Sequence, residues 1–134
     1  ASGLVGIGIT PTSTLHVAGT ANITTSITTA GTVTAQHFDN VSDITLKDNI
    51  EPITDALNII DLLNPVSFSW KKDGSKSYGL IAQEVEKVLP EIVHNDGETK
   101  TVSYIQLIAY LLSAVKEQQK EIKTLNSKLD DLTK

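Results

Sequence analysis

Ser42 and Lys47 carry the side chains of this sequence whose types and spacing point most directly to chemistry. A serine hydroxyl is a poor nucleophile until a base takes its proton, and a neutral lysine amine can serve as that base. The pair lies where the composition changes, since all 16 acidic residues and all 11 lysines lie at or beyond Asp39. A Ser/Lys pair at such a boundary is what a chain would need in order to cut itself there.

The spacing alone also fits an ordinary structural role. Ser42 and Asp43 are residue types that cap helices or start turns, and Lys47 would then be a surface lysine. Positions five apart do not share one face of a helix, which requires a spacing of three or four. A turn or a broken helix would therefore have to bring Ser42 and Lys47 together. Asp43 and Asp48 nearby favour the charged form of the lysine and oppose its use as a base.

The overall composition narrows the classes of partner. The chain has 134 residues, a net charge of −5 and no arginine, whereas nucleic-acid backbones are bound by clustered lysine and arginine. We therefore predict no nucleic-acid partner. No apolar run is long enough to span a bilayer, so we also predict no membrane partner. The chain lacks an initiator methionine, and we expect it to be part of a longer protein.

Cofactor and metal sites are not indicated. The sequence has no cysteine, and His16, His37 and His94 are too far apart in sequence to form a metal-binding motif. Gly6 and Gly8 do not form a phosphate loop, because no helix and no Gly-Lys-Ser/Thr motif follow them. We predict no metal and no cofactor, and we leave a nucleotide requirement open.

Residues 1–38 are rich in Thr and Gly, with apolar residues among them at Leu15, Val17, Ile23, Ile27, Val33 and Phe38. Thr and Val favour strands, and the Gly residues mark turns. The apolar stripe of a segment such as 23–29 is too narrow to be stable alone, so we predict short strands that pair with copies of themselves. A flexible low-complexity linker is the alternative. We assign residues 1–41 to a β-rich segment of this kind or to a linker.

From residue 42 onward the sequence is typical of a small α+β domain with hairpins. Thr54-Asp55 can cap a helix over residues 56–63. A strand is predicted at 66–70, a turn at 72–75, a returning strand at 78–81 and a second short helix at 82–89. A second hairpin, of strands 91–94 and 100–102 around Asp96-Gly97, is predicted to follow. Trp70 is predicted to lie in the core.

The last segment, residues 103–133, is predicted to be one long coiled-coil helix. Its apolar positions alternate in steps of four and three for about four heptads, with Lys and Glu on the flanks. The a positions are Ile108, Val115, Ile122 and Leu129, and the d positions are Leu111, Gln118, Leu125 and Leu132. A helix that packs on its own domain is the alternative. The heptads alone do not separate two strands from three.

The residues from 42 onward also resemble a known family. The stretch Ser42-Asp43 with Leu46-Lys47-x-Asn49-Ile50 is followed by Ala56-Leu57-x-x-Ile60-x-x-Leu63-x-Pro65-Val66, Phe68-x-Trp70, Gly79 to Val85, Pro90-Glu91 and Val102-x-Tyr104. This combination resembles the self-cleaving intramolecular chaperone domain at the C-terminus of phage tail spikes, tail fibres and neck appendages, of the endosialidase-tailspike type. The resemblance covers residues 42–134. Residues 5–8 and 15–17 resemble the sequence that often precedes this domain in phage and bacterial fibres.

The resemblance implies a function, partners and a location. Such domains form homotrimers, align three copies of the preceding fibre or spike domain, help it to fold and then sever themselves just before the signature serine. Here the bond cut would be Val41–Ser42. It separates residues 1–41, the end of a β-rich fibre shaft or a linker, from a chaperone domain of residues 42–134. The implied location is a virion tail or appendage precursor, made and processed in the cytoplasm of the bacterial host.

The resemblance also implies an autocatalytic serine endopeptidase with a Ser/Lys dyad. The Ser42 hydroxyl would attack the Val41 carbonyl, with Lys47 as the base. Attack could give an ester by an N-to-O shift that is later hydrolysed, or water could attack directly, and the sequence leaves both routes open. Asp43 and Asn49 are candidate supporting residues. Two alternatives are a trimerisation module of the same fold that never cuts, and a fibre tip that binds a receptor.

Overall fold

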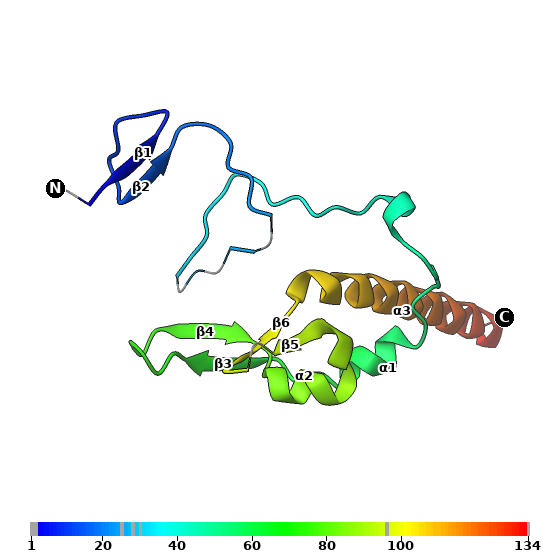
Figure 1. Ribbon diagram of the computed structural model, residues 1–134. Coiled ribbons are helices and arrows are strands. Elements are labelled where there is room, and N and C mark those ends of the chain that lie inside the picture. The colour runs from blue at the N-terminus through cyan, green and yellow to red at the C-terminus, as the bar shows by residue number, and fades with distance from the viewer. Residues whose placement is uncertain (1–2, 25, 28, 30, 96, 134) are drawn as a thin grey trace. The chain divides into compact units, whose positions relative to one another are not determined.

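A computed structural model of the chain describes residues 3–24, 26–27, 29, 31–95 and 97–133. The chain divides into two compact units, Ala1–Leu46 and Lys47–Lys134, and each is described by itself. Among the described residues, the α-helices all lie in the second unit (Figure 1). The predicted α+β class with a long C-terminal helix is confirmed. The predicted domain boundary after residue 41 stays a prediction.

The described part of the first unit contains a pair of parallel strands, β1 (Val5–Ile7) and β2 (Leu15–Val17). Parallel neighbours usually need a connection of a dozen or more residues, but here it is only residues 8–14. The connection turns sharply at Gly8, whose φ of +73° favours glycine. A Cβ at that position would also lie 2.9 Å from the Ala18 carbonyl oxygen. Glycine therefore lets the chain return beside its own first strand.

The described residues between 18 and 43 form no helix or strand in the single chain. The strands predicted for this region were expected to pair with copies of themselves, so the fibre shaft stays a prediction. Residues 25 and 28 of the predicted 23–29 segment lie outside the described residues. A short 3-10 helix, η1 (Ile44–Leu46), ends the first unit.

The second unit combines three α-helices with two hairpins in its described residues. Its elements are α1 (Ala56–Asp61), β3 (Val66–Ser69), β4 (Lys76–Gly79), α2 (Ala82–Val88), the 3-10 helix η2 (Pro90–Ile92), β5 (Val93–Asn95), β6 (Lys100–Val102) and α3 (Tyr104–Leu132). The strands pair as antiparallel β3–β4 and β5–β6, as predicted, with ends shifted by up to two residues. Asp96, in the predicted turn of the second hairpin, lies outside the described residues.

The β3–β4 turn follows from the sequence Asp73-Gly74-Ser75. Asp73 Oδ1 accepts hydrogen bonds from the Ser75 backbone N at 2.9 Å and from its hydroxyl at 2.6 Å. Gly74 has a φ of +73°, which residues with a Cβ rarely adopt. The turn thereby sets the register that pairs Ser69 with Lys76.

The prediction that Trp70 lies in the core is wrong. Its side chain is 57% exposed and meets Phe68 edge to face, with ring centroids 5.2 Å apart. Phe68 is half-buried within β3, whereas Trp70 comes just after the strand. The hairpin is a single two-stranded sheet, so a ring beyond its last paired residue has little to pack against.

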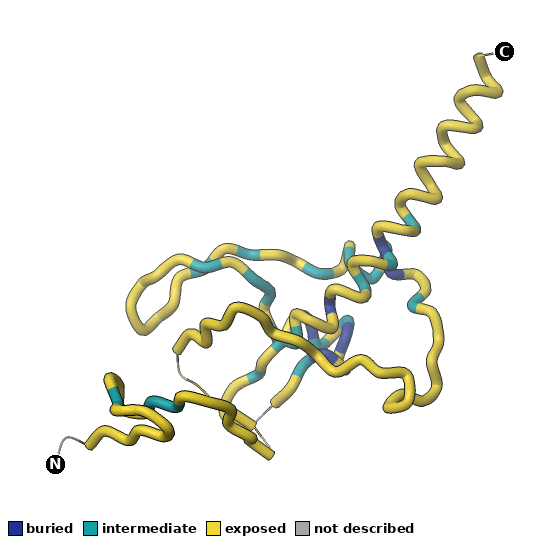
Figure 2. The backbone as a smooth tube through the Cα atoms, turned by 90° about the horizontal axis from the view of Figure 1, so that it is seen from above, coloured by how far each residue is buried: buried dark blue, intermediate teal, exposed yellow. Residues whose placement is uncertain are grey.

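The core of the second unit lies where α2 and η2 meet the first turns of α3. Its buried side chains are Val85, Leu89, Ile92 and Leu107. The half-buried residues packed against them are Ile59, Ile60, Leu63, Leu80, Val88, Val93, Val102 and Tyr110. Figure 2 shows the buried positions gathered on these elements and on the start of α1. The core is small, and it leaves most of α3 outside it.

Helix α3 has two different faces. Leu107 and Ala114 are buried against their own unit, where α1 packs against α3. The a and d residues, called the seam below, point elsewhere, and the apolar ones are between 45% and 85% exposed. Every described residue from 118 to 133 is exposed (Figure 2). The helix therefore packs on its own domain through one face and leaves the predicted coiled-coil seam uncovered on another.

Candidate functional site

A turn at Asp43 shapes the segment around Ser42. Asp43 Oδ1 accepts two hydrogen bonds from Thr45, from its backbone N at 2.8 Å and from its hydroxyl at 2.7 Å. These bonds, chiefly the one from the backbone N–H, hold the pKa of the Asp43 carboxyl below its ordinary value. A backbone bond from Leu46 N to Asp43 O at 3.2 Å completes the single turn of η1. Asp43, predicted as a supporting residue, thus organises the backbone next to Ser42.

Ser42 and Lys47 stand on either side of η1 in the sequence, and both are exposed. Ser42 belongs to the first compact unit, and Lys47 is the first residue of the second. Each is therefore placed within its own unit, and their pairing as a dyad stays a prediction. Val41, on the other side of the predicted cleavage bond, is 83% exposed.

Asn49, the other predicted supporting residue, has a backbone role. Its φ of +51° lies in the left-handed region, which asparagine tolerates better than most residues with a Cβ. Pro52 follows, with a φ held by its ring. These two residues restrict the paths that the chain can take between Lys47 and Ile53.

Downstream of this segment the chain is fastened to α3 at three points. The Ser113 hydroxyl donates a hydrogen bond to Ile53 O at 2.8 Å. The Glu117 carboxylate accepts from the first N–H groups of α1, with Oε1 3.1 Å from Ala56 N and Oε2 2.8 Å from Leu57 N. A carboxylate is favoured there because a helix N-terminus presents unpaired N–H groups and a positive dipole end.

Glu117 takes the place of the N-cap that the sequence predicts. Asp55 occupies the N-cap position of α1 but has a φ of +58° and makes no side-chain bond to the helix backbone. Its carboxylate instead accepts from Asn58 Nδ2 at 2.5 Å. The prediction that Thr54-Asp55 caps the helix is wrong, because a carboxylate 61 residues away in sequence occupies the N–H groups.

Tyr104, the first residue of α3, contacts the end of β4 and the residue after it. Its hydroxyl oxygen accepts a hydrogen bond from Leu80 N at 2.9 Å. A Cβ on Gly79 would lie 2.6 Å from the same oxygen, closer than real Cβ contacts allow. Glycine at 79 therefore makes room for the tyrosine hydroxyl, and this contact joins two of the sequence motifs in space.

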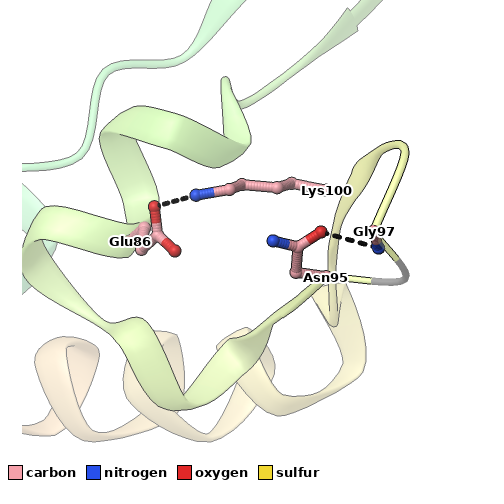
Figure 3. A network of polar contacts seen from close by, with 4 residues as sticks. All are labelled: Glu86, Asn95, Gly97 and Lys100. Carbon is pink, nitrogen blue, oxygen red and sulfur yellow. Dashed lines mark hydrogen bonds and ion pairs between the residues drawn. The ribbon is translucent and has the colours of Figure 1, made fainter.

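Figure 3 shows polar contacts around the second hairpin. Lys100 Nζ on β6 forms an ion pair with Glu86 Oε2 on α2. The side chains are 25% and 42% exposed, so we expect the pair to contribute less than about 1 kcal/mol. Asn95 Oδ1 accepts from Gly97 N at 3.0 Å and shapes the hairpin turn. The ion pair joins α2 to the hairpin, and neither contact involves a predicted site residue.

A further contact connects α3 to η2. The Tyr110 hydroxyl donates to Glu91 Oε1 at 2.7 Å. This hydrogen bond, with smaller contributions from burial and from the negative charge of Glu91, raises the pKa of Tyr110 above its ordinary value. The described residues include no group of three or more His, Cys, Asp or Glu side chains arranged to hold a metal. Within the same residues, no helix has both the length and the apolar character of a membrane span.

Comparison with known protein families gives a match over part of the chain. Residues 42–94 match the model of peptidase family S74, described as the chaperone of endosialidase, and the match begins at Ser42 itself. The resemblance carried by the sequence motifs is confirmed.

The chain is also similar to phage fibre proteins. It is 38% identical over 98 residues, 66% of this chain, to the long tail fiber protein Gp37 of Enterobacteria phage K3 and equally to that of Enterobacteria phage T2. Identity to Gp37 of Salmonella phage S16 is 31% over 114 residues, 76% of this chain. The chain spans only 8%, 7% and 15% of the lengths of these three relatives.

The chaperone-of-endosialidase match covers η1, α1, the β3–β4 hairpin and α2, and it ends within β5. The side chains that fasten this segment, Tyr104, Ser113 and Glu117, lie beyond it on α3. Neither Ser113 nor Glu117 was predicted as a site residue, and Glu117 is one of the Lys and Glu residues on the flanks of the heptads. The one sequence signal that could have indicated a joint role is their spacing. Ser113 and Glu117 are four residues apart, so they share one side of the helix, and that side lies away from the seam.

Proposed function

We propose that this chain is an intramolecular chaperone of a phage tail fibre or spike, which releases itself by cutting the Val41–Ser42 bond. The family match that begins at Ser42 carries the proposal. The similarity to long tail fibre proteins supports a role in assembling a virion tail component. The partners are two further copies of this chain and the fibre or spike domain that precedes residue 42. Processing takes place in the cytoplasm of the bacterial host.

The exposed seam of α3 supports the homotrimer. Its apolar a and d side chains are largely in contact with water in the single chain, and pairing copies of the helix would bury them. Three copies joined through their seams would bring three copies of residues 1–41 into proximity. Alignment of those copies is the chaperone step, and cleavage then removes the domain that aligned them.

Cleavage is an acyl transfer from the nitrogen of Ser42. Lys47 takes the proton of Ser42 Oγ as this oxygen attacks the Val41 carbonyl carbon, and the proton passes to the Ser42 nitrogen as the C–N bond breaks. Water then hydrolyses the ester between Val41 and Ser42 Oγ, leaving a carboxylate on Val41 and a free amine on Ser42. Direct attack by a lysine-activated water gives the same two products without the ester.

The test follows the intact mass of the purified chain over time, beside Ser42→Ala and Lys47→Ala. Ser69→Ala and Lys72→Ala are matched controls, because both residues are exposed on the β3–β4 hairpin. We expect fragments that end at Val41 and begin at Ser42 in the unsubstituted chain and in both controls, and none in the Ser42 and Lys47 variants. An intact chain in every sample, or unchanged cutting by Ser42→Ala, would contradict the proposal.

A trimerisation module that never cuts is the second candidate. The exposed seam favours it, because self-association requires no reactive side chain. The oligomeric mass of each sample, measured alongside the fragments, separates the two. A stable trimer with no fragments over days would establish the non-cleaving module.

A further inference from the structure

The contacts that hold Ile53 and α1 to α3 bear on the cleavage reaction. We propose that Ser113 and Glu117 are positioning residues, which tie the chain just downstream of Lys47 to the coiled-coil helix and so couple assembly of the seam to cleavage. We call these two side chains, with their bonds to Ile53 O and to the backbone N of Ala56 and Leu57, the clamp. The inference rests on the proposed self-cleavage.

The clamp fixes both the place and the direction of the chain that enters α1. Each oxygen of Glu117 accepts from a different backbone N–H, at 3.1 and 2.8 Å, and both contacts are partly buried. A carboxylate that receives two parallel bonds orients its partners as well as attracting them. The Ser113 hydroxyl adds a bond to a carbonyl three residues before Ala56, at 2.8 Å. Residues 53–57 are therefore held as one piece on α3.

Lys47 is tied to this piece by a short segment. Six residue steps separate Lys47 from Ile53, and a fully extended chain of that length spans about 20 Å at most. Asn49 in the left-handed conformation and Pro52 remove much of the remaining freedom. The position of Ile53 therefore limits where Lys47 can lie, and small displacements of a reacting group slow a reaction strongly.

The clamp and the seam use different sides of the same helix. With Ile108 at a and Leu111 at d, Ser113 falls at f and Glu117 at c, so copies can associate through a and d without touching the clamp. From residue 118 to 133, the described part of α3 is exposed throughout. Association stabilises this helix, and the helix holds Ser113 and Glu117 at the spacing that the clamp requires. Association would therefore stabilise the helix that carries the clamp, whose three bonds the single chain already makes.

The experiment measures the rate of fragment formation in full-length chains with substitutions in the clamp. Glu117→Ala removes both acceptors, whereas Glu117→Gln keeps one. Ser113→Ala removes the hydroxyl, and Ser113→Thr restores it. Glu121→Gln is the matched control, since it removes the same charge from an exposed side chain one turn further along α3.

We expect Glu117→Ala to cut about 10-fold more slowly or worse, in line with the cost of misplacing a catalytic group. Glu117→Gln should be intermediate, Ser113→Ala slow, and Ser113→Thr and Glu121→Gln close to the unsubstituted chain. A parallel sample of each variant also carries Ser42→Ala, so that its folding and oligomeric mass can be measured without cleavage. Cleavage rates are compared at a temperature at which all of these parallel samples are fully folded and have the same oligomeric mass. If the clamp had a purely structural role, the substitutions would lower the unfolding temperature. They would leave the cleavage rate unchanged at the temperature of the comparison, where every variant is folded.

The outcomes distinguish the two proposals. If the unsubstituted chain cuts and the folded Glu117→Gln and Ser113→Ala chains cut equally fast, the clamp proposal is overturned while self-cleavage stands. Should Glu117→Ala fail to fold, the Gln variant and the Ser113 pair decide the question. If the unsubstituted chain does not cut at all, self-cleavage is overturned and the positioning role falls with it.

Discussion

The hydroxyl of Tyr104 occupies the space in which residue 79 would carry a Cβ. Tyr104 begins the long helix α3, and Gly79 ends strand β4. A Cβ on Gly79 would lie 2.6 Å from the tyrosine oxygen, which is held in place by a bond from Leu80 N at 2.9 Å. The close approach ties the first hairpin to α3, and it gives a physical reason for glycine at this position.

This contact predicts that Gly79→Ala destabilises the fold, and that Tyr104→Phe relieves much of the penalty. Overpacking of this kind costs about 1–3 kcal/mol, and removal of the hydroxyl removes the atom with which the new methyl collides. Chemical denaturation of the two single variants and the double variant, all carrying Ser42→Ala, measures the coupling free energy. Equal penalties for Gly79→Ala with tyrosine and with phenylalanine at 104 would show that the collision does not occur.

The bond between Tyr110 and Glu91 predicts a loss of stability at alkaline pH. The pKa of Tyr110 is raised in the folded state, chiefly because its hydroxyl donates to the Glu91 carboxylate. The folded state therefore holds the proton more tightly than the unfolded chain. This contribution is fully present below the ordinary tyrosine pKa of about 10 and is lost as the pH rises through the folded-state value.

Urea unfolding from pH 8 to 11 checks this dependence. Tyr110→Phe should unfold with a shallower decline above about pH 10, the range in which an ordinary tyrosine ionises. Tyr78→Phe is the control, because that ring is 81% exposed on β4 and makes no corresponding bond to a carboxylate among the described residues. Identical pH profiles for Tyr110→Phe and the unsubstituted chain would argue against the Tyr110–Glu91 bond.

The seam predicts that one charged substitution separates the copies. Leu125 is a d residue, 63% exposed in the single chain, and Leu125→Asp would place a charge where apolar side chains meet. We expect the oligomeric mass to fall to that of one chain, with a loss of helix signal from residues 118–132. Lys123→Asp, off the seam, should keep its mass. An unchanged mass for Leu125→Asp would mean that association does not use the seam.

Local signals account for most of what could be predicted about the fold. Apolar periodicity over Ile108 to Leu132 marked a helix that the structure places at Tyr104–Leu132, and Asp73-Gly74 marked the first hairpin turn. These features depend on residues close together in sequence, so spacing and turn chemistry suffice to find them. Trp70 was misplaced because burial depends on what covers a strand, which local alternation does not reveal.

Some features of the candidate site could be predicted from neighbouring residues, and others could not. Ser42, Lys47 and the turn at Asp43 could be proposed from residue types within six positions of one another. The hydrogen bonds from the start of α1 to Glu117 could not be predicted, because Glu117 is 61 residues from Ala56 in sequence. From the sequence alone, Glu117 is indistinguishable from the other charged residues beside the heptads.

The sequence by itself determined the α+β class, the heptads of the long helix and the family motif that starts at Ser42, because each is written in neighbouring residues. Only the tertiary structure decided which face of α3 packs inward, that Glu117 rather than Asp55 binds the start of α1, and that Tyr104 requires glycine at 79. The physical reason is that hydrogen bonds and close contacts between distant segments depend on how helices and hairpins dock, and docking is set by the whole core at once.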